Sequence, residues 1–339
     1  MWINPALKKC SNVVSNSIKQ VDKIISETQP KPSNSVCEKM TQIDRNIFDM
    51  YLYGRGLKTG ITQKEINELF KKEGNDFLAS AYNLLTSKMN FPEEIRPAIY
   101  LNVCNGDNIM QYNYANHSIF IDPQKIEGLS KAQLYGLLRH ELQHCKQNYI
   151  VLRDENIGPI ATEKYARRIV DTERNNIEIL LKAPIEEVEK LNINMQDYNN
   201  IKNLYYNDPK GYEQIFENNY QTYKQQLNNI REQVIAKFGT IKEGSTESKQ
   251  AKLYFDDFTN DMTYYNSDGT VNEAKYLSKI TEQEAILADS IAECEVTGQC
   301  FFKKSKDETL AVMKNQEFMD KVKQESQNAE NNYNNVLNK

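Results

Sequence analysis

Two histidines and a glutamate stand close together in the sequence, at a spacing that suits metal chemistry. They are His140, Glu141 and His144, in the segment HELQH. Residues four apart lie on one side of an α-helix, so both imidazoles can reach one ion. The glutamate beside the first histidine borders the same cleft, where it can take a proton from a metal-bound water. The spacing therefore predicts a metal site with Glu141 as general base.

The histidine pair stands out because histidine is rare in this chain. Only three histidines are present, and two of them lie in HELQH. The alternative interpretation is a surface helix that carries two ordinary histidines and a solvated glutamate. The third histidine, His117, is expected at the start of a short strand. A lone histidine there is more often a turn or edge residue than a ligand.

A third ligand has to come from elsewhere in the chain, because a catalytic zinc ion takes three protein ligands and keeps one position open for water. Two predicted helices offer a carboxylate. One contains Glu163 and Glu173, and the other contains Glu282 and Glu284. Small residues after Glu282, beginning with Ala285, favour close packing of the second helix on the motif helix. The third ligand is therefore expected on the second helix.

Only one of the two glutamates on that helix can face the ion, because residues two apart on a helix point about 200° apart. Glu284 lies three residues after Thr281 and can close a capping box with it. This leaves Glu282 as the preferred ligand. The alternative is that both are solvated carboxylates at a helix start, where the helix dipole favours them.

The segment that carries HELQH has strong helix signals. Ser130 is a good N-cap, and Gln133 three residues later completes a capping box. Gly136, one turn before His140, would let another chain segment or a substrate come close. The core-facing stripe of this helix consists of Leu134, Leu137, Leu138 and Cys145.

Two short strands are expected before this helix. Residues 99–104 alternate as a strand does, and a second strand runs from His117 to Ile121. Asn105-Gly106-Asp107 is a turn signal between them, which predicts a meander or hairpin. The strand at 117–122 is expected to offer its edge to an extended peptide.

The rest of the chain is predicted to be mainly helical. One helix begins at Thr62 with a capping box to Glu65 and continues through Leu85. Long amphipathic helices fill 161–250, and residues 255–272 are expected to form a loop. The predicted parts are a flexible N-terminal arm at 1–40, a core with the HExxH helix at 41–154, a helical insertion at 155–265, a third-ligand helix at 270–300 and a charged tail at 301–339.

Composition excludes several classes of protein. The chain has 339 residues and a net charge of -5, which gives no electrostatic case for nucleic-acid binding. No stretch approaches the roughly 20 apolar residues of a membrane helix. The six cysteines form no CxxC pair, so a cysteine zinc site is not expected. With no secretory signal in view, the expected location is cytoplasmic.

These features together resemble the gluzincin branch of the zincin metallopeptidases. The resemblance covers HELQH on a helix, the strand HSIFID before it and the later segment TEQEA, within residues 95–150 and 273–297. It implies an α+β, mostly helical fold: a zincin-like core with a short antiparallel sheet packed on the HExxH helix, plus a long helical insertion. It also implies zinc (Zn2+) held by His140, His144 and Glu282, with a protein or peptide as substrate.

Two other interpretations stay open. The chain can be a helical scaffold or interaction protein whose zincin-like core no longer catalyses, or a peptidase toxin or effector that acts in another cell. The sequence does not single out a residue that stabilises the oxyanion. The candidates are Tyr112, Tyr114, Tyr149 and Tyr276.

Overall fold

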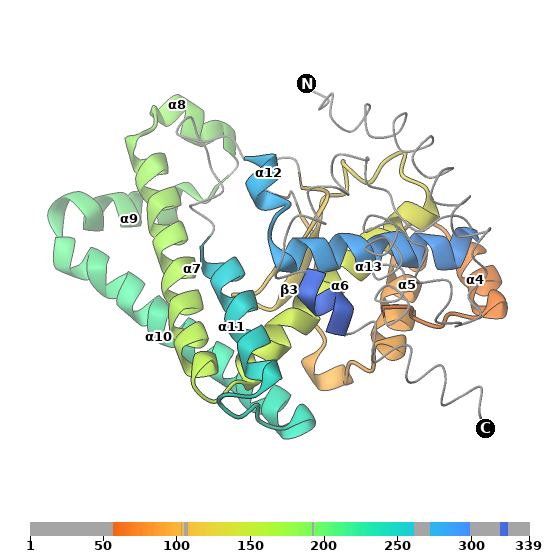
Figure 1. Ribbon diagram of the computed structural model, residues 1–339. Helices are drawn as coiled ribbons and strands as arrows, with labels where there is room; N and C mark the ends of the chain where they lie inside the picture. Colours follow the sequence, from red (N-terminus) through yellow and green to blue (C-terminus); the bar gives the residue numbers. More distant parts are fainter. Residues whose placement is uncertain are drawn as a thin grey trace, which may run out of the picture. The chain divides into compact units, whose positions relative to one another are not determined.

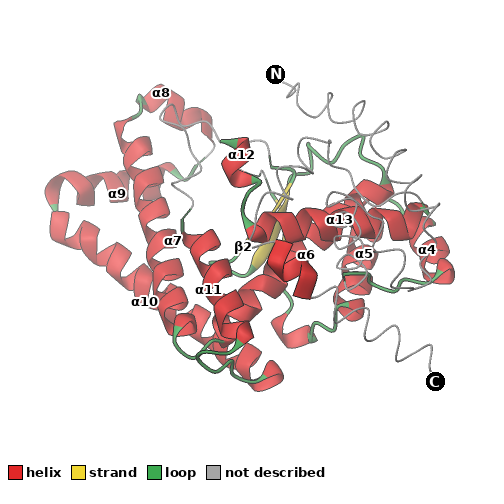
Figure 2. Ribbon diagram, viewed as in Figure 1, coloured by secondary structure: helices red, strands yellow, loops and turns green. Residues whose placement is uncertain are grey.

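The computed structural model describes residues 57–102, 104, 108–191, 193–260, 272–298 and 319–324. The predicted arm at 1–40, the turn at 105–107 and most of the tail at 301–339 lie outside these residues. Within them the protein is mostly helical with one small sheet, so the predicted α+β, mostly helical class is confirmed (Figure 1, Figure 2). Among the described helices, none is both long and apolar enough to cross a bilayer.

The regular elements follow one another along the chain as helices interrupted once by three strands. The strands are β1 (Ala98–Leu101), β2 (Met110–Asn113) and β3 (Ser118–Ile121). The α-helices are α4 (Gln63–Phe70), α5 (Gly74–Lys88), α6 (Lys131–Arg153), α7 (Ile157–Lys182), α8 (Ile185–Val188), α9 (Met195–Asn207), α10 (Pro209–Phe238), α11 (Thr246–Thr259), α12 (Glu273–Tyr276) and α13 (Ile280–Thr297). Two 3-10 turns lie at Glu93–Ile95 and Glu189–Leu191, and residues 319–324 form a further helical segment.

The chain divides into two compact units. Unit 1 contains residues 1–112, 119–147 and 256–339, and unit 2 contains residues 113–118 and 148–255. The helix with HELQH begins in unit 1, and α13 lies wholly within it. The five predicted parts of the chain are not tested by this division and stay a prediction.

The helix expected from Thr62 to Leu85 is broken into two. Thr62 and Glu65 form the predicted capping box at the start of α4. The chain then leaves the helix at residues 71–73, and Gly74 has a φ of +52°. A left-handed residue cannot continue an α-helix, so α5 starts in a new direction. Its buried face includes Phe77, Leu78 and Leu85.

The sheet is short, as predicted, but it is mixed rather than antiparallel throughout, with the strand order β1-β3-β2. The hairpin consists of β2 and β3, joined by a turn in which the Asn113 side chain accepts hydrogen bonds from the N–H groups of Ala115 and Asn116. His117 ends this turn with a φ of +54°. The strand β2 was not anticipated, and β1 is largely exposed.

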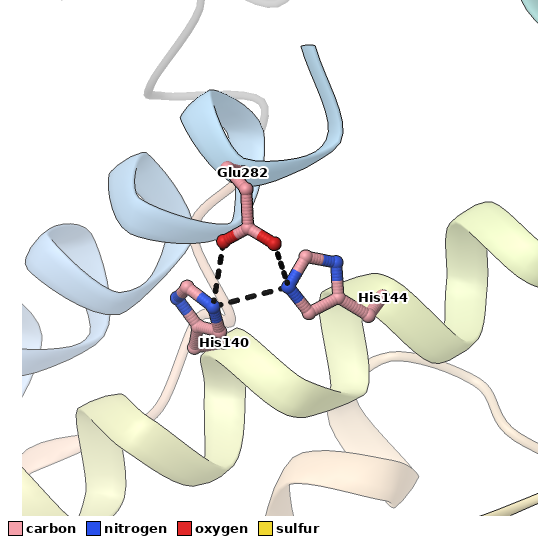
Figure 3. A group of neighbouring side chains, drawn as sticks. All are labelled: His140, His144 and Glu282. Carbon is pink, nitrogen blue, oxygen red and sulfur yellow. Dashed lines mark hydrogen bonds and ion pairs between the residues drawn. The ribbon is translucent and has the colours of Figure 1, made fainter. Parts of the chain in front are cut away.

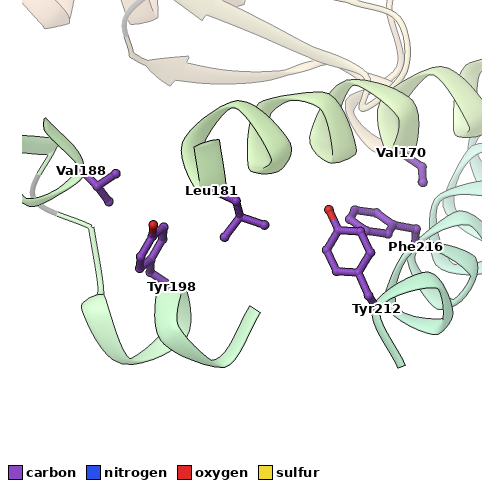
Figure 4. Packing of buried hydrophobic residues seen from close by; sticks show 6 residues of the cluster. All are labelled: Val170, Leu181, Val188, Tyr198, Tyr212 and Phe216. Atoms are coloured by element: carbon purple, nitrogen blue, oxygen red, sulfur yellow. The ribbon is translucent and has the colours of Figure 1, made fainter. Parts of the chain in front are cut away.

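The core of unit 2 is formed between long amphipathic helices. Figure 4 shows side chains from α7, α8, α9 and α10 that are buried together. They are Val170, Leu181, Val188, Tyr198, Tyr212 and Phe216. Asp208 caps α10 by accepting from the N–H of Gly211, and Gly239 ends it with a φ of +78°.

The segment 255–272, expected to be a loop, is partly helical. Helix α11 continues through Thr259, and Phe255 and Phe258 are buried. Two buried aromatic side chains at this spacing stabilise the helix beyond what the Asp residues between them suggest. Residues 261–271 lie outside the described part of the chain.

Candidate metal centre

Helices α6 and α13 contact each other in unit 1, and small residues are buried on α13 and present at the contact on α6. Ala285, Ala288 and Ala292 of α13 are fully or almost fully buried. Gly136 of α6 lies against the side chains of Asp289 and Glu293, and a Cβ at this position would be only 2.9 Å from Glu293 Cγ. The predicted close approach of another chain segment at Gly136 is confirmed.

The start of α6 forms as its sequence predicts. The N–H of Gln133 donates to Ser130 Oγ at 3.2 Å, and the N–H of Ser130 donates to Gln133 Oε1 at 2.9 Å. This capping box fixes where the helix begins. It therefore also fixes the direction in which His140 and His144, two and three turns later, leave the helix.

His140, His144 and Glu282 converge on one point (Figure 3). The two Nε2 atoms of the histidines lie 3.1 Å apart. The carboxylate oxygens of Glu282 lie 3.6 Å from His140 Nε2 and 3.5 Å from His144 Nε2. Ligands about 2.0 Å from a tetrahedral zinc ion lie about 3.3 Å from one another. The donor set and its spacing therefore fit a zinc ion with one further position open.

The negative charge of Glu282 and the positive charge of protonated His144 stabilise each other. Although burial alone lowers the pKa of His144, the neighbouring Glu282 carboxylate raises it to about 9. Burial works against ionisation of Glu282 as well, but His144 and His140 hold the pKa of this carboxyl well below its usual range. The pocket between the three side chains thus favours a positive charge, which a metal ion can supply in place of a proton.

Gln147 determines which nitrogen of His144 faces the other two side chains. Gln147 is fully buried, and its Oε1 lies 3.0 Å from His144 Nδ1. An amide oxygen only accepts hydrogen bonds, so Nδ1 of His144 is the donor, and Nε2 carries the lone pair once the imidazole has lost its second proton. This is the tautomer that a metal ligand at Nε2 requires.

Glu141 contacts the sheet. Its Oε2 accepts a 2.6 Å hydrogen bond from the N–H of Tyr112 in β2. Glu141 is 5% exposed, and its other oxygen, Oε1, accepts no hydrogen bond from the part of the chain that the structure describes. One oxygen thus holds the carboxylate in place, and the other could accept a proton.

The start of α13 differs from the prediction. Lys279 is the N-cap and makes no side-chain cap, and Thr281 lies inside the helix. Thr281 donates from its N–H and its Oγ1 to Asp257 Oδ2 at 3.0 and 3.2 Å. Asp257 of α11 therefore caps α13 from outside, and burial raises the pKa of Asp257 to about 6. The capping box between Thr281 and Glu284 does not form.

The other candidate carboxylates have different partners. Glu284 is buried and accepts a hydrogen bond from Gln147 Nε2. Glu163 pairs with Lys224, and Glu173 accepts hydrogen bonds from Asn219 and Tyr223, all within unit 2. In the described residues, the one group of His, Cys, Asp and Glu side chains arranged to hold a metal is His140, His144 and Glu282.

His117 and the four tyrosines also have identifiable contacts. His117 Nε2 lies 3.2 Å from the hydroxyl of Tyr149, and the ring of Tyr114 packs against Tyr165. Tyr112 is buried in β2, and the ring of Tyr276 lies 5.4 Å from the ammonium of Lys279. None of these contacts identifies an oxyanion-stabilising residue.

No family model, curated protein or solved structure matches the chain. The case for function consequently rests on the residues of the site and on their geometry.

Three residues at the site were not anticipated from the sequence. Gln147 is the one that a local signal could have revealed, because it lies three residues after His144 and such residues are neighbours on a helix. Asp257, which caps α13, and Lys321, which forms an ion pair with Glu284, come from segments far away in the sequence. Their roles follow from tertiary packing alone.

Proposed function

We propose that the protein is a zinc-dependent metallopeptidase. The observation that carries the proposal is the convergence of His140 Nε2, His144 Nε2 and the Glu282 carboxylate on one point of a buried site. These three residues would hold the ion. A zinc ion with an open position lowers the pKa of bound water and polarises a carbonyl group, which is the chemistry that amide hydrolysis needs.

Glu141 would act as the general base in this reaction. Its backbone follows His140 directly, so it borders the place where both histidines point. The hydrogen bond from the N–H of Tyr112 to Oε2 holds the carboxylate, and Oε1 accepts a proton from the attacking water. The same oxygen then delivers the proton to the leaving amine, as microscopic reversibility of acid–base catalysis allows.

The structure does not leave the strand at 117–122 free to bind a peptide at its edge, although the sequence predicts this role. The strand at 117–122 was expected to accept the peptide, but β3 is the central strand of the sheet and has a neighbour on each side. The strand β2 is an outer strand, and the N–H of its Tyr112 points to Glu141. An extended peptide along the outer edge of β2 would pass beside the general base.

The decisive experiment compares the wild type with Glu141→Gln. The variant keeps the size of the side chain but cannot accept a proton, so it should fold, keep its zinc and lose peptide hydrolysis by at least about 10²-fold. A peptide library serves as substrate, and metal analysis of both proteins serves as the control.

Two outcomes would contradict the proposal. Equal cleavage by the wild type and Glu141→Gln would refute the role of Glu141. A wild type that binds no zinc after purification and dialysis against zinc would refute the metal centre itself and favour a helical scaffold without catalysis.

A further inference from the structure

A buried chain of polar contacts leads from His144 to the helical segment 319–324. His144 Nδ1 lies 3.0 Å from Gln147 Oε1. Gln147 Nε2 donates to Glu284 Oε2 at 2.9 Å, and Lys321 Nζ forms an ion pair with Glu284 Oε1. All four side chains belong to unit 1. They come from α6, from α13 and from residues 319–324.

Two hydrogen-bond acceptors near Gln147 determine the orientation of its side-chain amide. Its Nε2 donates to the carbonyl oxygen of Thr281 at 3.1 Å as well as to Glu284. Both partners are acceptors, so the nitrogen of the amide must face them and the oxygen must face His144. Rotating the amide by 180° would bring its oxygen against two other oxygens. Glu284 and Thr281 thus determine, through Gln147, which tautomer His144 adopts.

Glu284 can do this only as a fixed carboxylate. It is 1% exposed, and burying a carboxylate is unfavourable unless a positive charge compensates it. Lys321 supplies that charge on the oxygen that Gln147 does not use. The neighbouring Gln143 lies 3.5 Å from Glu284 Oε2 and itself accepts a hydrogen bond from Arg139.

We propose that Glu284 and Lys321 are positioning residues of the metal centre, which act through Gln147 to hold His144 in the orientation and tautomer that bind the ion. The inference rests on the proposed metal site at His140, His144 and Glu282. It places the segment 319–324, which supplies no metal ligand, in control of how tightly the metal is held.

The test measures the zinc affinity of the full-length chain by competition with a chelator. Lys321→Met should weaken zinc binding about 10-fold, the low end of the effect of losing a direct hydrogen-bond partner of a metal-bound histidine, because Lys321 acts on His144 only through Glu284 and Gln147. Lys321→Arg keeps the charge and should restore most of the affinity. Lys323→Met is the matched control, because Lys323 lies two residues further on and is exposed; its affinity should equal that of the wild type.

A merely structural role of Lys321 would give a different result. Lys321→Met would then unfold at a lower temperature but bind zinc as tightly as Lys323→Met, and the inference would be overturned. Zinc absent from the wild type would overturn the proposed function and this inference together. Equal affinities in variants that do bind zinc would overturn this inference alone.

If Lys321→Met does not fold, nuclear magnetic resonance of the zinc-loaded wild type provides a second test. With ¹⁵N-labelled histidine, His144 should coordinate through Nε2 and carry a slowly exchanging proton on Nδ1. That proton should show a through-space contact to the side-chain amide of Gln147. Coordination through Nδ1, or a rapidly exchanging Nδ1 proton, would overturn the proposal.

Discussion

The carboxylate of Asp289 occupies the space that a side chain at Gly136 would need. The two residues belong to α13 and α6, the helices that carry Glu282 and the histidine pair. Their contact limits how closely the two helices approach and therefore affects the distance between the proposed metal ligands. A substitution of Gly136 should consequently change the zinc affinity, although Gly136 is not one of the proposed ligands.

Gly136→Ala is expected to weaken zinc binding and to lower the free energy of unfolding by about 1–3 kcal/mol, the usual cost of overpacking a buried contact. Denaturant unfolding and chelator competition measure the two effects. The double variant Gly136→Ala/Asp289→Ala removes the carboxylate that the new methyl group would meet, and it should recover part of both losses. A single variant more stable than the wild type would show that this contact does not limit the approach of the helices.

The identity of the third ligand predicts an order of zinc affinities. Glu282→Ala should have the largest effect, because it removes a ligand atom. Glu284→Ala should weaken binding about 10- to 100-fold, because it removes only a support for Gln147. Glu173→Ala is the control and should bind as the wild type does, since Glu173 contacts Tyr223 and Asn219. A larger loss for Glu173→Ala than for Glu282→Ala would contradict the assignment.

Zinc binding should depend steeply on pH. The pKa of His144 in the metal-free site is raised to about 9, so at neutral pH this histidine carries a proton that zinc must displace. The apparent affinity should rise about tenfold per pH unit from about pH 7 and level off near pH 9. In the metal-free protein, protonated His144 stabilises the folded state because its pKa is higher there than in the unfolded chain. This contribution to the free energy of unfolding is lost as pH rises through about 9.

Calorimetry in buffers with different ionisation enthalpies counts the released protons. About one proton per zinc ion is expected at neutral pH from His144. As a control, nuclear magnetic resonance titration of metal-free Glu282→Gln should give a lower pKa for His144, because the carboxylate that raises it is gone. An affinity that does not change above neutral pH would contradict the prediction.

The sequence predicts the contacts between residues that are close together in the chain. The capping boxes at Thr62 and Ser130 involve residues three apart, and both form as expected. The pairing of His140 with His144 is likewise a property of one helix. Each depends on backbone geometry that the nearby residues determine by themselves.

The parts that could not be predicted depend on distant segments. Glu284 has the spacing of a capping residue, yet Lys321 and Gln147 bind it in the interior. Asp257 takes over the cap of α13 from another helix. The strand β2 is not predicted from its own residues, because its stability depends on pairing with the neighbouring strand β3.

Gln147 and Glu284 are hydrogen-bonded although 137 positions separate them in the sequence. Contacts over such distances form late in folding, because the chain between them must first lose its conformational freedom. A growing chain that has left the ribosome only as far as α6 has both histidines but neither Glu282 nor the carboxylate that orients Gln147. The proposed metal centre, with the residues proposed to position it, can therefore be completed only after α13 and residues 319–324 have been synthesised.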